Sequence, residues 1–166
     1  MRRADKEVKD LEQLEEILRA CTAVRIGTRD ERGMFIVPMS YGYTLEGEEL
    51  TLFVHSAPEG RKVSAFRSGG EAAFEMDCGH ALRPAATACG HSFTYRSIMG
   101  SGTIRELTGL EEKRTALNAI MVHMTGREWE LLAEQVRHVT AERIFDAMQT
   151  ASLDTVYFLK GKETAE

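Results

Sequence analysis

A hydroxyl, a glycine and two cations follow one another closely in residues 55–62. The pattern predicts that a strand ends here, a polar loop turns, and a helix begins with the two cations in its first turns. A phosphate binds well where a hydroxyl, free backbone N–H groups and cations meet. Ser56 would supply the hydroxyl, Gly60 the close backbone approach, and Arg61 and Lys62 the charge. Because the helix dipole disfavours cations at this end, a bound anion would explain the two cations. The alternative is that both are ordinary solvent-exposed cations at the start of a helix.

The sequence also contains two Cys-Gly-His triplets. Alternate residues on a strand share a face. If the loop 81–88 closes a symmetric hairpin, Cys78 lies opposite His91 and His80 opposite Cys89, which gathers ligand types that suit zinc. The spacing matches no zinc finger, and side chains two apart on a strand diverge by about 7 Å. The alternative is that these are unligated core or loop residues.

Periodicity predicts the elements that position these groups. Asp10 caps an amphipathic helix over 10–20. Pro38 places the middle of its strand at an edge or a bulge. Strands are predicted at residues 21–28, 34–43, 50–55, 71–77, 91–106 and 155–159. Further helices are predicted after Gly60, from a capping box of Thr108 and Glu111 to Thr125, and from Glu128 to about Met148.

Composition predicts one folded domain with a real core. The chain has 166 residues, of which 43% are hydrophobic and 28% charged. The net charge of −5 argues against a protein that attracts nucleic acid through its overall charge. No apolar run approaches the ~20 residues of a membrane helix, and the charged N-terminus does not look like a secretory signal. Three cysteines, an odd number, favour the reducing cytoplasm.

The order of the elements favours a mainly β fold with peripheral helices. Strands that are grouped rather than alternating with helices are typical of an antiparallel barrel or sheet. We therefore predict about six strands in an antiparallel barrel or sheet, as a single domain over residues 1–166. Its parts are an N-terminal helix within 1–20, a barrel core over 21–106, helices over 108–148 and a final strand over 155–160.

Four segments of the chain together resemble a known family. They are residues 37–43, 53–57, 60–62 and 95–102, in this order and spacing. They resemble the FMN-binding split-barrel family of pyridoxamine 5′-phosphate oxidase-like proteins, and most of all its nitroimidazole-resistance, Nim-type branch. The first three residues and residues 89–97 are also similar to that branch. The resemblance covers residues 1–125 well, whereas the sequence after residue 125 is atypical.

The resemblance implies a six-stranded antiparallel split β-barrel that forms a homodimer with FMN at the subunit interface. The residues it assigns to the cofactor are Val37, Pro38, Met39, Ser40 and Tyr41 beside the isoalloxazine ring, His55, Ser56 and Gly60 along the ribityl-phosphate path, Arg61 and Lys62 at the phosphate, and Arg96 and Ser97 from the long strand, across the dimer interface. The oxidases usually have Gln where this chain has Ser97, and their C-terminal Trp and Arg segment has no match. Both departures argue against their vitamin substrate.

The activity that the resemblance implies is reduction of a small molecule such as a nitroaromatic. The flavin would take electrons from a nicotinamide donor or a reduced partner and pass them to this acceptor, while the protein supplies position and electrostatics. His55 is the candidate catalytic side chain, since imidazole donates, accepts or carries charge near neutrality. A structural histidine at a strand end is the alternative. The rival function is a non-enzymatic flavin- or haem-binding module, with His55, His80 or His91 as axial ligand.

Overall fold

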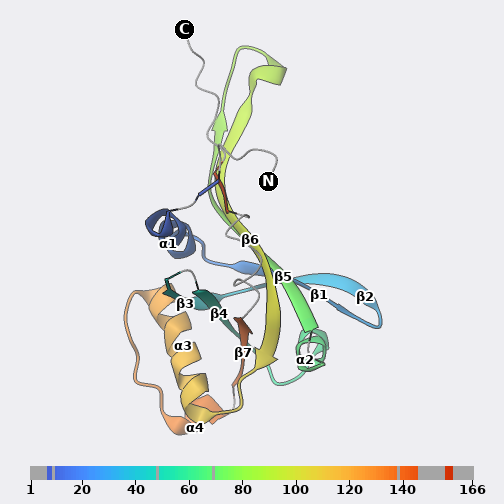
Figure 1. Ribbon diagram of the computed structural model, residues 1–166, viewed down its shortest axis with the longest axis vertical. Coiled ribbons are helices and arrows are strands. Elements are labelled where there is room, and N and C mark those ends of the chain that lie inside the picture. Colours follow the sequence, from blue (N-terminus) through green and yellow to red (C-terminus); the bar gives the residue numbers. More distant parts are fainter. Residues whose placement is uncertain are drawn as a thin grey trace.

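The computed structural model describes residues 7–8, 10–47, 49–68, 70–137, 139–145 and 156–158. These residues form one antiparallel sheet with helices around it (Figure 1). The strands are β1 (Val24–Asp30), β2 (Gly33–Met39), β3 (Tyr41–Glu46), β4 (Glu49–Ser56), β5 (Gly70–Arg83), β6 (Ser92–Glu106), β7 (Thr140–Phe145) and β8 (Val156–Phe158). The helices are α1 (Leu11–Ala20), α2 (Arg61–Arg67), α3 (Leu110–Thr125) and α4 (Ala133–Arg137).

The sheet follows the order β2-β1-β5-β6-β7-β4-β3, and β8 pairs with β6 off this path. The sheet is open, because β2 and β3 stand at its two ends. This arrangement confirms the predicted fold class, a mainly β antiparallel split barrel with peripheral helices. Pro38 lies in β2 at one end of the sheet, where a missing ladder donor is tolerated, as the sequence predicts.

The described residues contain more strands than the six predicted. The predicted strand 34–43 is two strands, because the chain breaks at Ser40 between β2 and β3. The predicted helix from Glu128 to about Met148 is wrong: it holds only α4, followed by β7, and its last residues lie outside the described part. β7 pairs with both β4 and β6, so it joins the two halves of the sheet. This tertiary pairing overrides the local helical pattern.

The long β5–β6 hairpin extends away from the body of the molecule (Figure 1). Its register places Cys78 opposite Arg96 and then shifts at a bulge between Cys78 and Ala81. Gly79 lies in this bulge with a φ of 68°, a left-handed conformation that suits glycine. The expectation that Cys78 lies opposite His91 is therefore wrong, because the bulge and the longer strands move the turn.

The helices begin close to where the sequence places them. Asp10 caps α1 by accepting a hydrogen bond from the backbone N–H of Glu12, 3.0 Å, as predicted. The predicted capping box of Thr108 and Glu111 is wrong by one residue, since α3 is capped at Gly109 and its box carboxylate belongs to Glu112.

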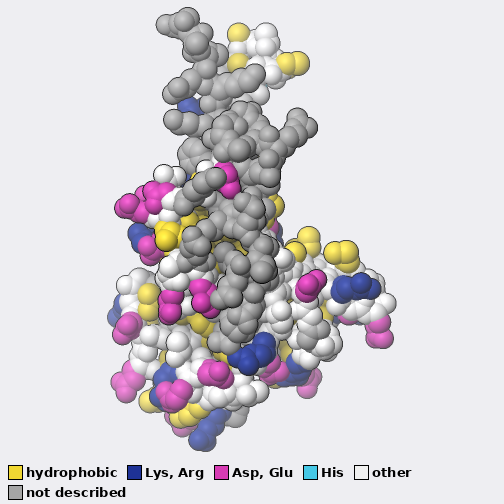
Figure 2. Space-filling view, viewed as in Figure 1, with side chains coloured by type: hydrophobic (Ala, Val, Ile, Leu, Met, Phe, Trp, Pro, Cys, Tyr) yellow, Lys and Arg dark blue, Asp and Glu magenta, His cyan; other side chains and the backbone are white. Residues whose placement is uncertain are grey.

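Acidic and basic side chains are interspersed over the face of the molecule shown in Figure 2. Among the described helices, none combines the length and the hydrophobicity that crossing a membrane requires. One core cluster contains the buried face of α1 and side chains of six strands, and a second lies between α3 and the sheet.

Candidate functional site

Three strands and one helix meet at the end of the sheet where the sequence predicts anion binding. β3 begins beside the end of β4, where Tyr41 pairs with Val54. β4 ends beside the beginning of β7, where Ser56 pairs with Thr140. The chain then turns through Gly60 into α2. We call residues 55–62 together with residues 140–142 the β4–α2 corner. It contains most of the predicted phosphate ligands.

A buried carboxyl group lies at this corner. Glu142 of β7 is 0% exposed, and the buried Ser56 hydroxyl donates a hydrogen bond to its Oε1, 2.9 Å. Its Oε2 is buried and has no hydrogen-bond partner among the described residues. Burial, aided by the charge of Glu106, raises the pKa of Glu142 to about 7, while the Ser56 hydrogen bond and the cations of α2 oppose the rise. The site therefore holds a carboxyl group that titrates near neutrality.

The two cations of α2 that act on Glu142 are Lys62 and Arg67. Arg67 is already engaged: it donates to both oxygens of Glu106, 2.6 and 3.2 Å, and to the carbonyl of Pro58, 3.1 Å. This pairing lowers the pKa of Glu106. Lys62 is half-buried, and within the described part of the chain it has no hydrogen bond or ion pair. Lys62 is therefore the cation available to a ligand at the corner.

Arg61, the other predicted phosphate ligand, points to a different place. Its guanidinium donates to both carboxylate oxygens of Asp30, 2.8 and 2.9 Å, and lies over the ring of Phe35, 4.0 Å from its centroid. The hydrogen bond from Arg61 lowers the pKa of Asp30 to about 2. Arg61 and Asp30 line a cavity of about 460 Å³ with Ser64 of α2. The structure thus separates the two cations that the sequence groups together.

His55 and Ser56 face opposite sides of the sheet, as successive strand residues do. His55 is exposed, whereas Ser56 is buried. Residues 37–41, which the resemblance places beside the flavin ring, also differ from one another in exposure. Tyr41 is fully buried and its hydroxyl donates to the carbonyl of Leu18, 2.6 Å, so only its backbone remains for a ligand. Ser40 is exposed at the break between β2 and β3.

Arg96 and Ser97 do not reach the corner within one copy of the chain. Glu106 pairs with Glu142, and Arg96 precedes it by ten residues along β6, about 33 Å at the rise of a strand. The guanidinium of Arg96 lies 3.5 Å from Glu16 of α1. The Ser97 hydroxyl is buried and has no partner among the described residues.

The two Cys-Gly-His triplets do not gather into a metal site. His80 Nε2 contacts a carboxylate oxygen of Asp77, and the ring stacks on Tyr95, with ring centroids 5.9 Å apart. His91 donates from Nδ1 to the carbonyl of Thr87, 2.9 Å, in the loop that also holds Cys89. In the part of the chain that the structure describes, no three His, Cys, Asp or Glu side chains are placed to hold a metal ion.

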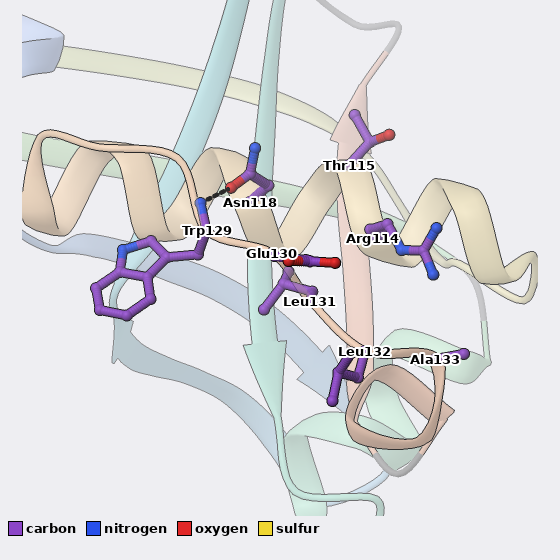
Figure 3. Close-up of a pocket in the computed structure, with 8 residues that line it drawn as sticks. All are labelled: Arg114, Thr115, Asn118, Trp129, Glu130, Leu131, Leu132 and Ala133. Carbon is purple, nitrogen blue, oxygen red and sulfur yellow. Dashed lines mark hydrogen bonds between the residues drawn. The ribbon is translucent and has the colours of Figure 1, made fainter.

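A separate cavity of about 440 Å³ lies between α3 and residues 129–133 (Figure 3). Asn118 of α3 accepts a hydrogen bond from the backbone N–H of Trp129, 2.9 Å, and the indole of Trp129 extends away from Arg114. The indole N–H donates to Thr125, 2.9 Å. These contacts fasten the loop to the helix, and none of the predicted ligand residues lines this cavity.

The family model described as pyridoxamine 5′-phosphate oxidase matches residues 10–152. The chain belongs to this family. It is also similar to the solved structure of a candidate 5-nitroimidazole antibiotic resistance protein from Bacteroides thetaiotaomicron, with 30% identity, a TM-score of 0.69, and coverage of 82% of this chain and 80% of that one. This match confirms the predicted resemblance to the nitroimidazole-resistance branch.

Two more distant structures share the fold. An FAD- and haem-binding protein from Mycobacterium smegmatis is 17% identical, with a TM-score of 0.74 over 94% of this chain and 74% of that one. A flavocytochrome from Azotobacter vinelandii is 16% identical, with a TM-score of 0.66 over 96% of this chain and 82% of that one. No curated protein matches the chain.

Sequence reasoning misses Glu142 as a member of this corner and Arg67 as a cation that acts on it. Glu142 lies in the region predicted as helix, where a glutamate is expected on a solvated face. Thr140, Ile144 and Phe145 are β-branched or aromatic residues typical of strands, and they are the signal that could have found β7. The match of the family model continues through this strand.

Proposed function

We propose that this protein binds FMN and is a flavin-dependent reductase of small molecules, with nitroaromatic compounds as the acceptor class. The family membership and the 30% identity to a candidate nitroimidazole-resistance protein support this proposal. The observation that carries it is the β4–α2 corner, where Lys62 and the Ser56 hydroxyl both act on the buried carboxyl group of Glu142. Among the described residues, Lys62 has no hydrogen bond or ion pair, and Oε2 of Glu142 has no hydrogen-bond partner.

The residues at the corner fit a phosphate group. Lys62 would supply the charge, Ser56 a hydroxyl, and Gly60, whose φ is 130°, a backbone without a side chain at the turn. The exposed backbone around Ser40 would border the ring system. When bound, FMN supplies reversible transfer of an electron pair between a reduced donor and an acceptor. The chain's own part is to bind the phosphate, orient the ring and exclude water.

A homodimer completes the proposed site. Arg96 and Ser97 lie too far along β6 to reach the corner of their own copy, and the buried Ser97 hydroxyl has no partner among the described residues. A second copy would bring these groups to the flavin. We place the protein in the cytoplasm, because its three cysteines are free thiols and reducing compartments maintain that state.

The first test is the absorption spectrum of the purified protein, with any released cofactor identified by mass. Flavin bands and the mass of FMN support the proposal. A sharp Soret band would assign the protein to the haem-binding alternative, and a colourless protein that ignores added FMN would contradict both.

The second test removes the charge at the corner. We expect Lys62→Ala to weaken FMN binding about ten-fold to a hundred-fold in a fluorescence titration, because a charge-assisted hydrogen bond contributes about 1.5–3 kcal/mol. Arg61→Ala should weaken it less, because that guanidinium is already paired with Asp30. Arg19→Ala, which removes an exposed cation of α1 paired with Glu15, is the control. Equal affinity of the Lys62→Ala and control proteins would refute the phosphate assignment.

A further inference from the structure

The side chain of Glu142 lies on the face of the sheet opposite to α3. Ala141, its neighbour in β7, packs in the cluster beneath α3, so Glu142 faces the other way. Oε1 accepts the Ser56 hydrogen bond, and Oε2 is buried without a partner in the described part of the chain. A buried oxygen left unsatisfied costs free energy, and it requires a reason.

The groups around Glu142 come from four elements. β4 contributes Ser56, β6 contributes Glu106, and α2 contributes Lys62 and Arg67. Lys113 of α3 donates to the carbonyl of Val139, 3.1 Å, and acts electrostatically on Glu106. Two cations therefore favour an ionised Glu142, while burial and Glu106 favour its neutral form. Burial contributes most, and it raises the pKa of Glu142 to about 7.

The Ser56 hydroxyl has one proton to donate. While that proton points to Oε1 of an ionised Glu142, Ser56 offers a ligand only lone pairs. A phosphate oxygen needs a donor instead. If the proton simply turned to the phosphate, both oxygens of a buried carboxylate would lose their partners, which is costly. A proton on Glu142 removes the conflict, because the carboxyl group then donates to Ser56 Oγ and Ser56 donates to the phosphate.

We propose that the Ser56–Glu142 pair binds a phosphate monoester with uptake of one proton from solvent by Glu142. Glu142 is then a positioning residue, which sets the direction of the Ser56 hydrogen bond without touching the ligand. This inference rests on the proposed function, because it takes the phosphate of FMN as the ligand.

The test is an FMN titration from about pH 6 to about pH 8.5 on the wild-type protein, Glu142→Gln and Ser56→Ala. For the wild type, linkage of one proton makes the dissociation constant rise about ten-fold per pH unit above pH 7, or about thirty-fold by pH 8.5. Gln donates an N–H as the neutral acid donates its O–H, so Glu142→Gln should bind at pH 8.5 about as tightly as the wild type binds at about pH 6.5. The second ionisation of the ligand's phosphate, near about pH 6, is common to all three proteins, so it cancels when the proteins are compared at the same pH.

The Ser56→Ala protein separates the hydrogen-bond relay from a bulk charge effect. It keeps Glu142 but has no hydroxyl that can reorient. Its affinity for FMN should therefore be lower at pH 7 and should not fall steeply above pH 7. A fall as steep as that of the wild type would overturn the relay. A calorimetric titration of the wild type in two buffers of different ionisation enthalpy needs no variant. It should count about one proton taken up at about pH 8, and a count of zero overturns the inference.

The outcomes distinguish this inference from the function on which it rests. FMN binding with the same pH profile in wild type and Glu142→Gln overturns the proton uptake and leaves the flavin proposal standing. Absence of FMN binding at every pH overturns both.

Discussion

At the scale of single residues, the most deeply buried polar side chain of the candidate site is a carboxyl group. Glu142 has no exposed surface, and among the described residues only one of its two oxygens has a hydrogen-bond partner, Ser56. Charged groups without full pairing are rarely buried unless they change their protonation state. The neutral acid is therefore the form that the folded protein favours at mildly acidic pH.

This burial predicts a pH dependence of stability without any ligand. The pKa of Glu142 rises from 4.5 in the unfolded chain to about 7 in the folded one. The folded state thus holds more protons between these values, and the contribution of Glu142 is fully present below about pH 4.5 and lost as pH rises through about 7, up to about 3 kcal/mol. Urea unfolding should show this fall in the wild type, and Glu142→Gln should lack it. A parallel fall in both proteins would contradict the raised pKa.

At the scale of elements, the approach of α3 to β3 depends on one glycine. A Cβ built on Gly42 would lie 2.3 Å from backbone atoms of Ala119 and Ile120. Backbone cannot move aside as a side chain can, so any larger residue must separate helix and strand. The second core cluster lies beneath this helix and would lose its packing.

We expect Gly42→Ala to lower the free energy of unfolding by about 3 kcal/mol or more, since overpacking costs about 1–3 kcal/mol even where side chains yield. Thermal unfolding followed by circular dichroism measures the change. Gly70→Ala is the matched control, because a Cβ at Gly70 of β5 meets nothing within 4 Å. Equal melting temperatures for the two variants would show that α3 can shift freely.

At the scale of the whole molecule, β2 exposes apolar side chains at one end of the sheet. Met34 and Ile36 of β2 are 85% and 71% exposed, and hydrophobic side chains appear on the β1–β2 hairpin in Figure 2. Ile36 lines a depression of about 530 Å³ with Met99 and the small residues of β1, β5 and β6. Exposed apolar surface of this kind marks an interaction site, which supports the proposed homodimer.

We expect the wild-type protein to sediment as a dimer and the variant Met34→Glu with Ile36→Glu to sediment as a monomer, because two buried carboxylates at the interface would be unpaired. The monomer should also lose FMN affinity, since Arg96 of a second copy no longer completes the site. Leu132→Glu is the control, because Leu132 is an exposed leucine, 49% accessible, just before α4. A dimeric double variant would place the interface elsewhere.

The sequence by itself determines the family, the fold class and the short-range elements. The cap at Asp10, the helix after Gly60 and the edge position of Pro38 depend on residues close together in the chain, so local pattern suffices. Tertiary structure alone decides the site. β7 forms because β4 and β6 offer their edges to it, and this pairing buries Glu142 against Ser56, 86 residues away along the chain. It also decides that Arg61 pairs with Asp30 while its neighbour Lys62 remains available, because adjacent side chains on a helix point in different directions.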